Sequence, residues 1–114
     1  MKAPRYVTWS PENRSQLIRI PAAKGEFKRI ELRSPDPCAN PYIAYAMLIY
    51  AGLDGIGKNL SCPEPVNVNL YRAPKELTDT LEKLPETLDE AQRFARESEF
   101  VRSHLPEKLI RTLD

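Results

Sequence analysis

The chain has 114 residues, of which 41% are hydrophobic and 29% charged, and its net charge is +1. This length allows one small domain, and this composition is ordinary for a soluble globular protein. The uncharged stretch of residues 41–53 is too short to cross a bilayer, and residues 1–4 contain no apolar signal core. Cys38 and Cys62 have no metal-ligand spacing. The sequence therefore predicts a cytoplasmic protein with reduced, unpaired thiols.

The charge is unevenly distributed along the chain. Residues 1–33 hold eight Lys or Arg against three Glu, a net charge of +5, whereas residues 34–114 have a net charge of −4. A basic segment of this kind is typical of a site for an anionic ligand. A solvated surface without a ligand explains the same excess equally well, so charge alone leaves both interpretations open.

Two short strands are the first elements that the sequence predicts. Residues 6–9 form an extended or turn segment. Residues 15–20 alternate as in a strand, which Pro21 ends, and residues 28–33 form a second strand after a loop. Because the connection between the two strands is short, the simplest pairing is an antiparallel β-hairpin.

A helix over residues 41–53 is predicted next. It follows the turn Ser34-Pro35-Asp36-Pro37, whose prolines exclude both a helix and a sheet. Asn40 is a suitable N-cap, and Pro41 suits the first helical position. Because this helix is apolar on all sides, we expect it to be buried. Its end is expected at the glycines 52, 55 and 57.

The second half of the chain divides into a loop and a helical tail. Residues 61–74 are rich in Pro and Asn, and residues 75–114 are predicted to be helical. Helical spacing and a capping-box pattern support the tail, at Leu77, Leu81, Leu84 and Thr87 with Glu90. The fold class is therefore α+β, with a strand-and-helix portion over residues 1–60.

Alternation along the second strand puts its charged residues on one face. Arg29, Glu31 and Arg33 share that face, and Ile30 and Leu32 share the other. Arginine offers carboxylate and phosphate groups a planar fork of donors and keeps its charge when partly buried. The charged face is therefore a candidate anion site.

The first strand extends this assignment. Ile18 and Ile20 share its apolar face, and we expect that face to pack with the apolar side of the second strand against the helix 41–53. Arg19 then joins the charged face, so that three arginines surround one carboxylate. Two alternatives remain: a solvated face with weak ion pairs, and a contact with the RNA backbone. The second would need exposed aromatics between the charges, of which this segment has few.

Several motifs occur in the order and spacing of one enzyme family. They are Asn13-Arg14-Ser15, Ile18-Arg19-Ile20-Pro21, Arg29-Ile30-Glu31-Leu32-Arg33, Asp36-Pro37 with Ala39-Asn40-Pro41-Tyr42, and Ala51-Gly52-Leu53-Asp54-Gly55. Through them the chain resembles the C-terminal part of the catalytic domain of type I glutamine synthetases of bacteria and archaea. The resemblance covers residues 3–84 closely and the helical tail more loosely.

The resemblance implies a fold and an activity. Residues 1–114 would be a fragment of a larger α+β, guanido-kinase-like catalytic domain. The family ligates ammonia to L-glutamate with ATP as a substrate, through a γ-glutamyl phosphate, and uses Mg²⁺ or Mn²⁺. Its members are large cytoplasmic homo-oligomers of nitrogen metabolism, with no nucleic-acid or membrane partner implied.

The resemblance also implies roles for individual residues. Glu31 matches a metal ligand, and Arg33 matches the arginine that binds glutamate and then the transferred phosphoryl group. Arg14, Arg19 and Arg29 match arginines that hold the nucleotide phosphates, with Arg14 and Arg33 as the catalytic pair. Tyr71 stands where some relatives carry a tyrosine that accepts an AMP group, although its flanking residues depart from that motif.

The other metal ligands of the family, its glycine-rich substrate loop and its N-terminal domain have no counterpart in these 114 residues. We therefore expect the isolated chain to be an inactive fragment. Two alternatives stay open. The chain could be a short paralogue that acts as a regulatory or binding module on full synthetase subunits, or a phosphate- or RNA-binding mini-domain.

Overall fold

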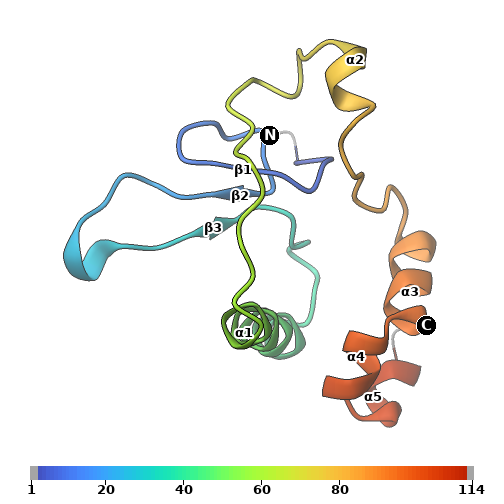
Figure 1. Ribbon diagram of the computed structural model, residues 1–114. Coiled ribbons are helices and arrows are strands. Elements are labelled where there is room, and N and C mark those ends of the chain that lie inside the picture. Colours follow the sequence, from blue (N-terminus) through green and yellow to red (C-terminus); the bar gives the residue numbers. More distant parts are fainter. Residues whose placement is uncertain (1–2, 113–114) are drawn as a thin grey trace. The chain divides into compact units, whose positions relative to one another are not determined.

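The computed structural model describes residues 3–112, which form a small α+β protein (Figure 1). The predicted α+β class is confirmed. The elements are β1 (Trp9–Ser10), β2 (Ile18–Arg19), the 3₁₀ turn η1 (Gly25–Phe27), β3 (Glu31–Leu32), α1 (Pro41–Gly57), α2 (Lys75–Thr78), α3 (Leu88–Glu97), α4 (Glu99–His104) and α5 (Glu107–Arg111).

The chain divides into two compact units. The sheet unit contains residues up to 36 together with residues 63–84, and the helical unit contains residues 37–62 together with residues from 85 onward. The predicted hairpin therefore belongs to one unit and the predicted helix to the other. The expectation that the hairpin packs on that helix stays a prediction.

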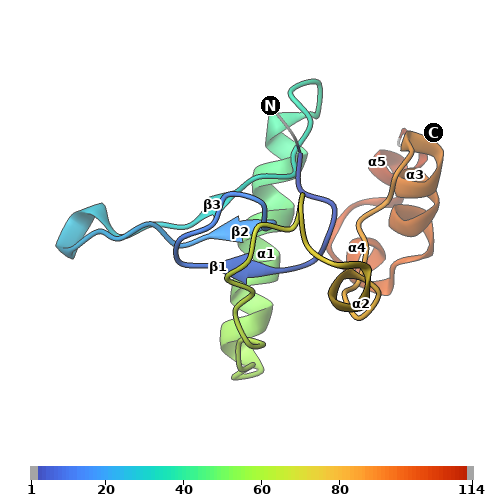
Figure 2. The same ribbon diagram turned by 90° about the horizontal axis from the view of Figure 1, so that it is seen from above.

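The sheet has the strand order β1-β2-β3 (Figure 2). β2 and β3 are antiparallel, with Ile18 opposite Leu32 and Arg19 opposite Glu31, which confirms the hairpin. β1 runs parallel to β2 and was not predicted as a strand, because two residues are too few to show an alternating pattern. The connection between β2 and β3 projects from the sheet, and Gly25 turns it with a φ of +61°.

The strands are shorter than the predicted ranges 15–20 and 28–33, and this changes the apolar face. Ile18 and Leu32 are half-buried, but Ile20 and Ile30 are 39% and 63% exposed. The expectation that all four form one buried face is wrong. The pairing of β2 with β3 stops at Arg19 and Glu31. Ile20 and Ile30 therefore lie beyond the paired part, where the chain separates toward the loop.

α1 begins as predicted and ends later. Asn40 Oδ1 accepts hydrogen bonds from Tyr42 N and Ile43 N at 2.9 and 3.4 Å, which confirms the N-cap. The helix continues through all three glycines to Gly57, so the predicted end was wrong. Asn59, with a φ of 52°, supplies the left-handed residue, and Leu60 N donates to Gly55 O at 3.0 Å. This is the Schellman motif, built on asparagine in place of glycine.

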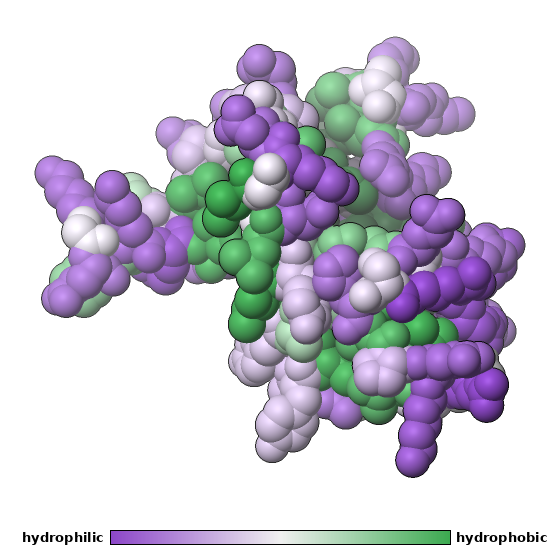
Figure 3. All heavy atoms as spheres, turned by 60° about the horizontal axis from the view of Figure 1, so that its bottom comes forward, coloured by the Kyte–Doolittle hydropathy of each residue, from purple (hydrophilic) through white to green (hydrophobic). Residues whose placement is uncertain are grey.

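The expectation of a buried helix is wrong for the described chain. No residue of α1 is buried, and Tyr42 and Ile56 are 85% and 78% exposed. α4 packs against one side of α1, where the Tyr50 and His104 rings lie 4.5 Å apart. Apolar side chains reach the molecular surface as green areas (Figure 3). A helix apolar on every side needs more surrounding protein than one neighbouring helix supplies.

The predicted helical tail is helical only in parts. After α2 the chain extends, with Val7 N donating to Glu82 O and Leu84 N donating to Arg5 O, both at 2.8 Å. The helical prediction for residues 79–84 was therefore wrong. Pro85 follows this segment and disfavours helical geometry at the residue before it.

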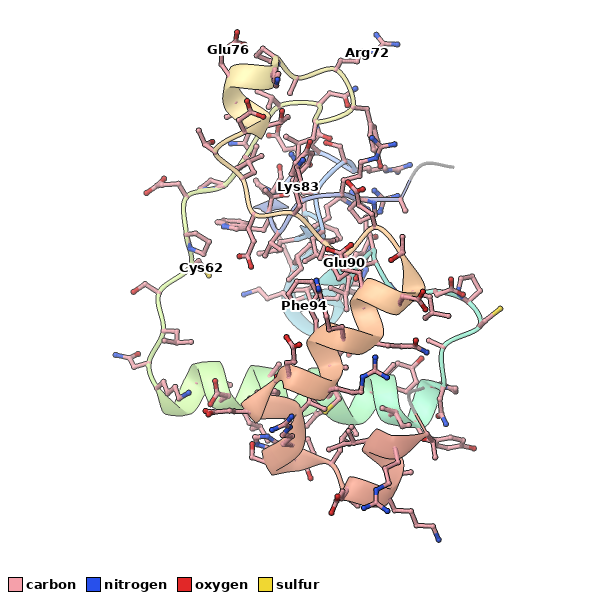
Figure 4. All side chains as sticks on the ribbon, turned by 90° about the vertical axis from the view of Figure 1, so that its right-hand side faces the viewer. Cys62, Arg72, Glu76, Lys83, Glu90 and Phe94 are labelled. Atoms are coloured by element: carbon pink, nitrogen blue, oxygen red, sulfur yellow. The ribbon has the colours of Figure 1, made fainter. Side chains whose placement is uncertain are left out.

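Residues from 85 onward follow the prediction more closely. Thr87 Oγ1 accepts from Glu90 N at 3.1 Å, which confirms the cap of α3, and Glu90 and Phe94 lie one turn apart on that helix (Figure 4). His104 is half-buried between the rings of Tyr50 and Phe100. No helix within residues 3–112 is long and apolar enough to span a membrane.

Candidate anion-binding site

An arginine–glutamate pair joins β2 to β3. Arg19 Nε donates to Glu31 Oε2 at 2.8 Å, and Arg19 Nη2 donates to Glu31 Oε1 at 2.7 Å. The register sets this contact, because the two residues are directly opposite each other in the antiparallel ladder. The prediction that Arg19 and Glu31 share a face is therefore confirmed, in a bidentate geometry that carboxylate and arginine favour.

The charges of two further arginines reach the same carboxylate. Hydrogen bonds from Arg19 hold the pKa of Glu31 below its ordinary value; the charges of Arg19, Arg29 and Arg14 lower it further, and partial desolvation opposes them. Glu31 in turn raises the pKa of Arg19. Arg29 comes from the end of the hairpin loop and Arg14 from the segment between β1 and β2, so three separate parts of the sheet unit supply positive charge around Glu31.

Arg33 follows β3 directly, and its backbone N donates to Leu17 O at 2.9 Å. Its side chain is half-buried, and its Nη1 atom is buried without a hydrogen-bond partner among the described residues. A buried guanidinium donor without an acceptor is unfavourable, since the desolvation of the N–H is not compensated. Arg33 is therefore placed to donate to an acceptor that residues 3–112 do not supply.

The family model described as "Glutamine synthetase, catalytic domain" matches residues 1–113. The chain belongs to this family. It is 47% identical over 106 residues to the glutamine synthetase of Staphylococcus aureus (strain MW2), and 45% identical over 106 residues to that of Staphylococcus epidermidis. Both matches include 91% of this chain and 24% of the relative, so the chain spans about a quarter of the length of these synthetases.

The described part of this chain does not hold a complete metal site. Among residues 3–112 no group of three or more His, Cys, Asp or Glu is arranged to bind a metal ion, and both oxygens of Glu31 accept from Arg19. Mg²⁺ and similar ions need several converging oxygens. These residues therefore do not fit the ion by themselves, and the role of Glu31 as a metal ligand stays a prediction.

A buried polar cluster in the sheet unit was not predicted. Ser10, Ser15 and Gln16 are almost completely buried, and they bond to the segment 66–70 of the same unit. The sequence pattern placed Ser15 and Gln16 only at the start of the predicted strand 15–20. Sequence gave no sign of a partner, because that partner is more than 50 residues away and is mostly backbone.

The arginine–glutamate pair predicts a pH dependence. Because the pKa of Glu31 is lower in the folded chain, its ionised form stabilises the fold above the ordinary glutamate pKa. That stabilisation disappears as the pH falls through the lowered pKa. We expect the ¹³Cδ resonance of Glu31 to titrate at a lower pH in the unmodified chain than in Arg19→Gln.

The matched control for this titration is Arg111→Gln. It removes an exposed ion pair of α5, Arg111 with Glu107 at 3.0 Å, and leaves the sheet unit intact. The midpoint of Glu31 should be the same in this variant as in the unmodified chain. Equal midpoints in the unmodified chain and in Arg19→Gln would show that Arg19 does not hold the carboxylate in solution.

Proposed function

We propose that this chain supplies the arginine-rich wall of a glutamine synthetase active site. The reaction is ATP-dependent ligation of ammonia to L-glutamate through a γ-glutamyl phosphate, in a cytoplasmic homo-oligomer. The observation that carries the proposal is the charge arrangement at Glu31, where Arg19 is paired and Arg14 and Arg29 are close enough to lower its pKa. Membership of the family supports the choice of reaction.

The proposed roles follow from the charge that each step must bind. Arg14, Arg19 and Arg29 hold the nucleotide phosphates. Arg33 binds the side-chain carboxylate of glutamate and then the transferred phosphoryl group, and its buried unpaired Nη1 supports this role. Arg14 and Arg33 stabilise the charge on the moving phosphoryl group, because phosphoryl transfer depends mainly on positioning and electrostatics.

Glu31 is proposed as one ligand of a site for Mg²⁺ or Mn²⁺ that other residues complete. In the described chain its carboxylate has a different task, which is to hold Arg19 in place on β2. Since one carboxylate is too few for such an ion, the isolated chain is proposed to be inactive.

A second function rests on α1. Its exposed apolar residues, among them Tyr42, Ile49, Leu53 and Ile56, form the kind of surface that binds protein. A short paralogue that docks on full synthetase subunits through α1 would use this surface and would need no complete active site.

Anion binding by the isolated chain tests the arginine wall. We expect ATP and tripolyphosphate to compete for the sheet unit, weakly and with an affinity that falls steeply with salt, because the arginines attract phosphate mainly through charge. Arg29→Ala should weaken tripolyphosphate binding about two- to fivefold, the range for one exposed charge pair. NMR titration in low and physiological salt measures both effects.

The matched control is Arg93→Ala, which removes one positive charge from α3 in the helical unit. Equal weakening by the two substitutions would mean that phosphate responds only to net charge, and would contradict a site. Tighter binding of single-stranded RNA than of ATP would favour the mini-domain alternative. In that case Phe27, 69% exposed beside Lys28 and Arg29, is the residue on which a base would stack.

A further inference from the structure

Buried side chains hold the backbone on both sides of Arg14. We propose that Gln16 is a positioning residue that fixes Arg14 for phosphate binding by fastening its segment to residues 66–70. This inference rests on the proposed function, since it takes Arg14 as a phosphate-binding residue. Gln16 is fully buried, with 0% of its surface exposed, so it cannot touch a bound phosphate and acts only through its neighbours.

The amide of Gln16 makes every bond that it can offer as a donor. Its Nε2 donates to Val66 O and, at 2.9 Å, to Val68 O. Its Oε1 lies 3.1 Å from Ser15 Oγ. A side chain thus takes the place of a strand partner and joins two segments that are 50 or more residues apart in the chain.

Ser15 and Asn13 complete the attachment. Ser15 Oγ accepts from Leu70 N at 2.9 Å and donates to Asn13 Oδ1 at 2.8 Å. Asn13 Oδ1 also accepts from Ser15 N at 2.9 Å, which closes a turn around Arg14, and Asn13 N donates to Ser10 Oγ at 3.1 Å. The backbone is therefore fixed on both sides of Arg14, while the Arg14 side chain remains exposed.

This arrangement matters because Arg14 lies outside the strands. Arg19 is held by its ion pair with Glu31, but Arg14 sits in a turn, where a long side chain on a mobile backbone would lose much of its binding energy to ordering. The charge of Arg14 nevertheless reaches Glu31. The buried amide supplies the rigidity that the local backbone of a turn lacks.

A double-mutant cycle separates positioning from general stability. We expect Arg14→Ala and Gln16→Met each to weaken tripolyphosphate binding about two- to fivefold, the value of one exposed charge pair. The double variant should bind tripolyphosphate no more weakly than whichever single variant binds it with the lower affinity, because Gln16 acts through Arg14. Thr8→Val is the matched control: it removes a buried hydroxyl that bonds Tyr6 O in the same unit, and it should leave the affinity unchanged.

The outcomes distinguish this inference from the function on which it rests. If Arg14→Ala leaves tripolyphosphate binding unchanged, the proposed role of Arg14 fails. If Arg14→Ala weakens binding while a folded Gln16→Met does not, or if the two effects add fully, the positioning role of Gln16 fails and the arginine site stands.

A second measurement needs no substitution, in case Gln16→Met does not fold. Coupling between two sites is reciprocal, so an anion held by Arg14 must stabilise the attachment to residues 66–70. In the unmodified chain, saturating tripolyphosphate should slow hydrogen exchange of the Leu70 amide, which bonds Ser15 Oγ, and this slowing should be absent in Arg14→Ala. An exchange rate of Leu70 that does not respond to tripolyphosphate would overturn the inference.

Discussion

The purified 114-residue chain should form no glutamine from glutamate, ammonia and ATP at any magnesium concentration. One carboxylate already paired with Arg19 cannot hold a divalent ion, and no saturable magnesium site is expected below about the millimolar range. Activity should appear only when the chain is combined with the part of a synthetase that it does not match. Ammonia-dependent release of phosphate, with chromatographic detection of glutamine, measures this.

The complement for this experiment is the remaining three quarters of the Staphylococcus aureus relative, expressed together with this chain. Arg33→Ala in the same mixture serves as the control, because it should assemble but fail to restore activity. Glutamine made by highly purified chain alone would disprove the fragment interpretation, and would mean that a complete site exists within these residues.

Replacing Arg33 by lysine in the reconstituted enzyme should raise the KM for glutamate and lower kcat. Lysine keeps the charge but loses the planar fork that binds a carboxylate through two donors. We expect kcat/KM for glutamate to fall about a hundredfold, the lower end for loss of one preorganised donor to a transition state. The KM for ATP should stay nearly the same. Steady-state kinetics with each substrate varied in turn measures the two effects.

Arg72→Lys is the matched control for this substitution. Arg72 is an exposed residue of the loop before α2, and the same chemical change there should leave both KM values and kcat unaltered (Figure 4). A variant of Arg33 that lost affinity for ATP and kept its affinity for glutamate would show that the two ligands had been assigned to the wrong arginines.

The elements that could be predicted from the sequence were those with local signals. The cap at Asn40, the cap at Thr87 and the antiparallel pairing of β2 with β3 depend on residues close together in the chain, and all three are present. The extended segment at residues 82–84 depends on backbone bonds to residues 5–7. Leucine spacing could not show this, because tertiary pairing overrides helical periodicity.

The candidate site was predictable to a similar extent. Alternation along the strands was enough to predict that Arg19 and Glu31 lie on the same face. It failed for Ile30, because the ladder is only two residues long and the rule applies only where strands are paired. The attachment that fixes Arg14 could not be predicted from the sequence. Gln16 bonds to backbone carbonyl groups, which every residue possesses, so no residue type marks its partners.

The division of the sheet unit between residues up to 36 and residues 63–84 has a consequence for chain entropy. When Gln16 bonds to Val68, 52 residues along the chain, it closes a long loop that contains the whole of α1. The entropy lost on closing a loop grows only with the logarithm of its length, by about 0.6 kcal/mol for each doubling. Evolution could therefore lengthen, shorten or re-cap the region between residues 37 and 62 at almost no cost to the fold that carries the arginines. A change to the side chain of Gln16 or to the backbone carbonyl groups that it binds would, in contrast, open the loop and destabilise that fold.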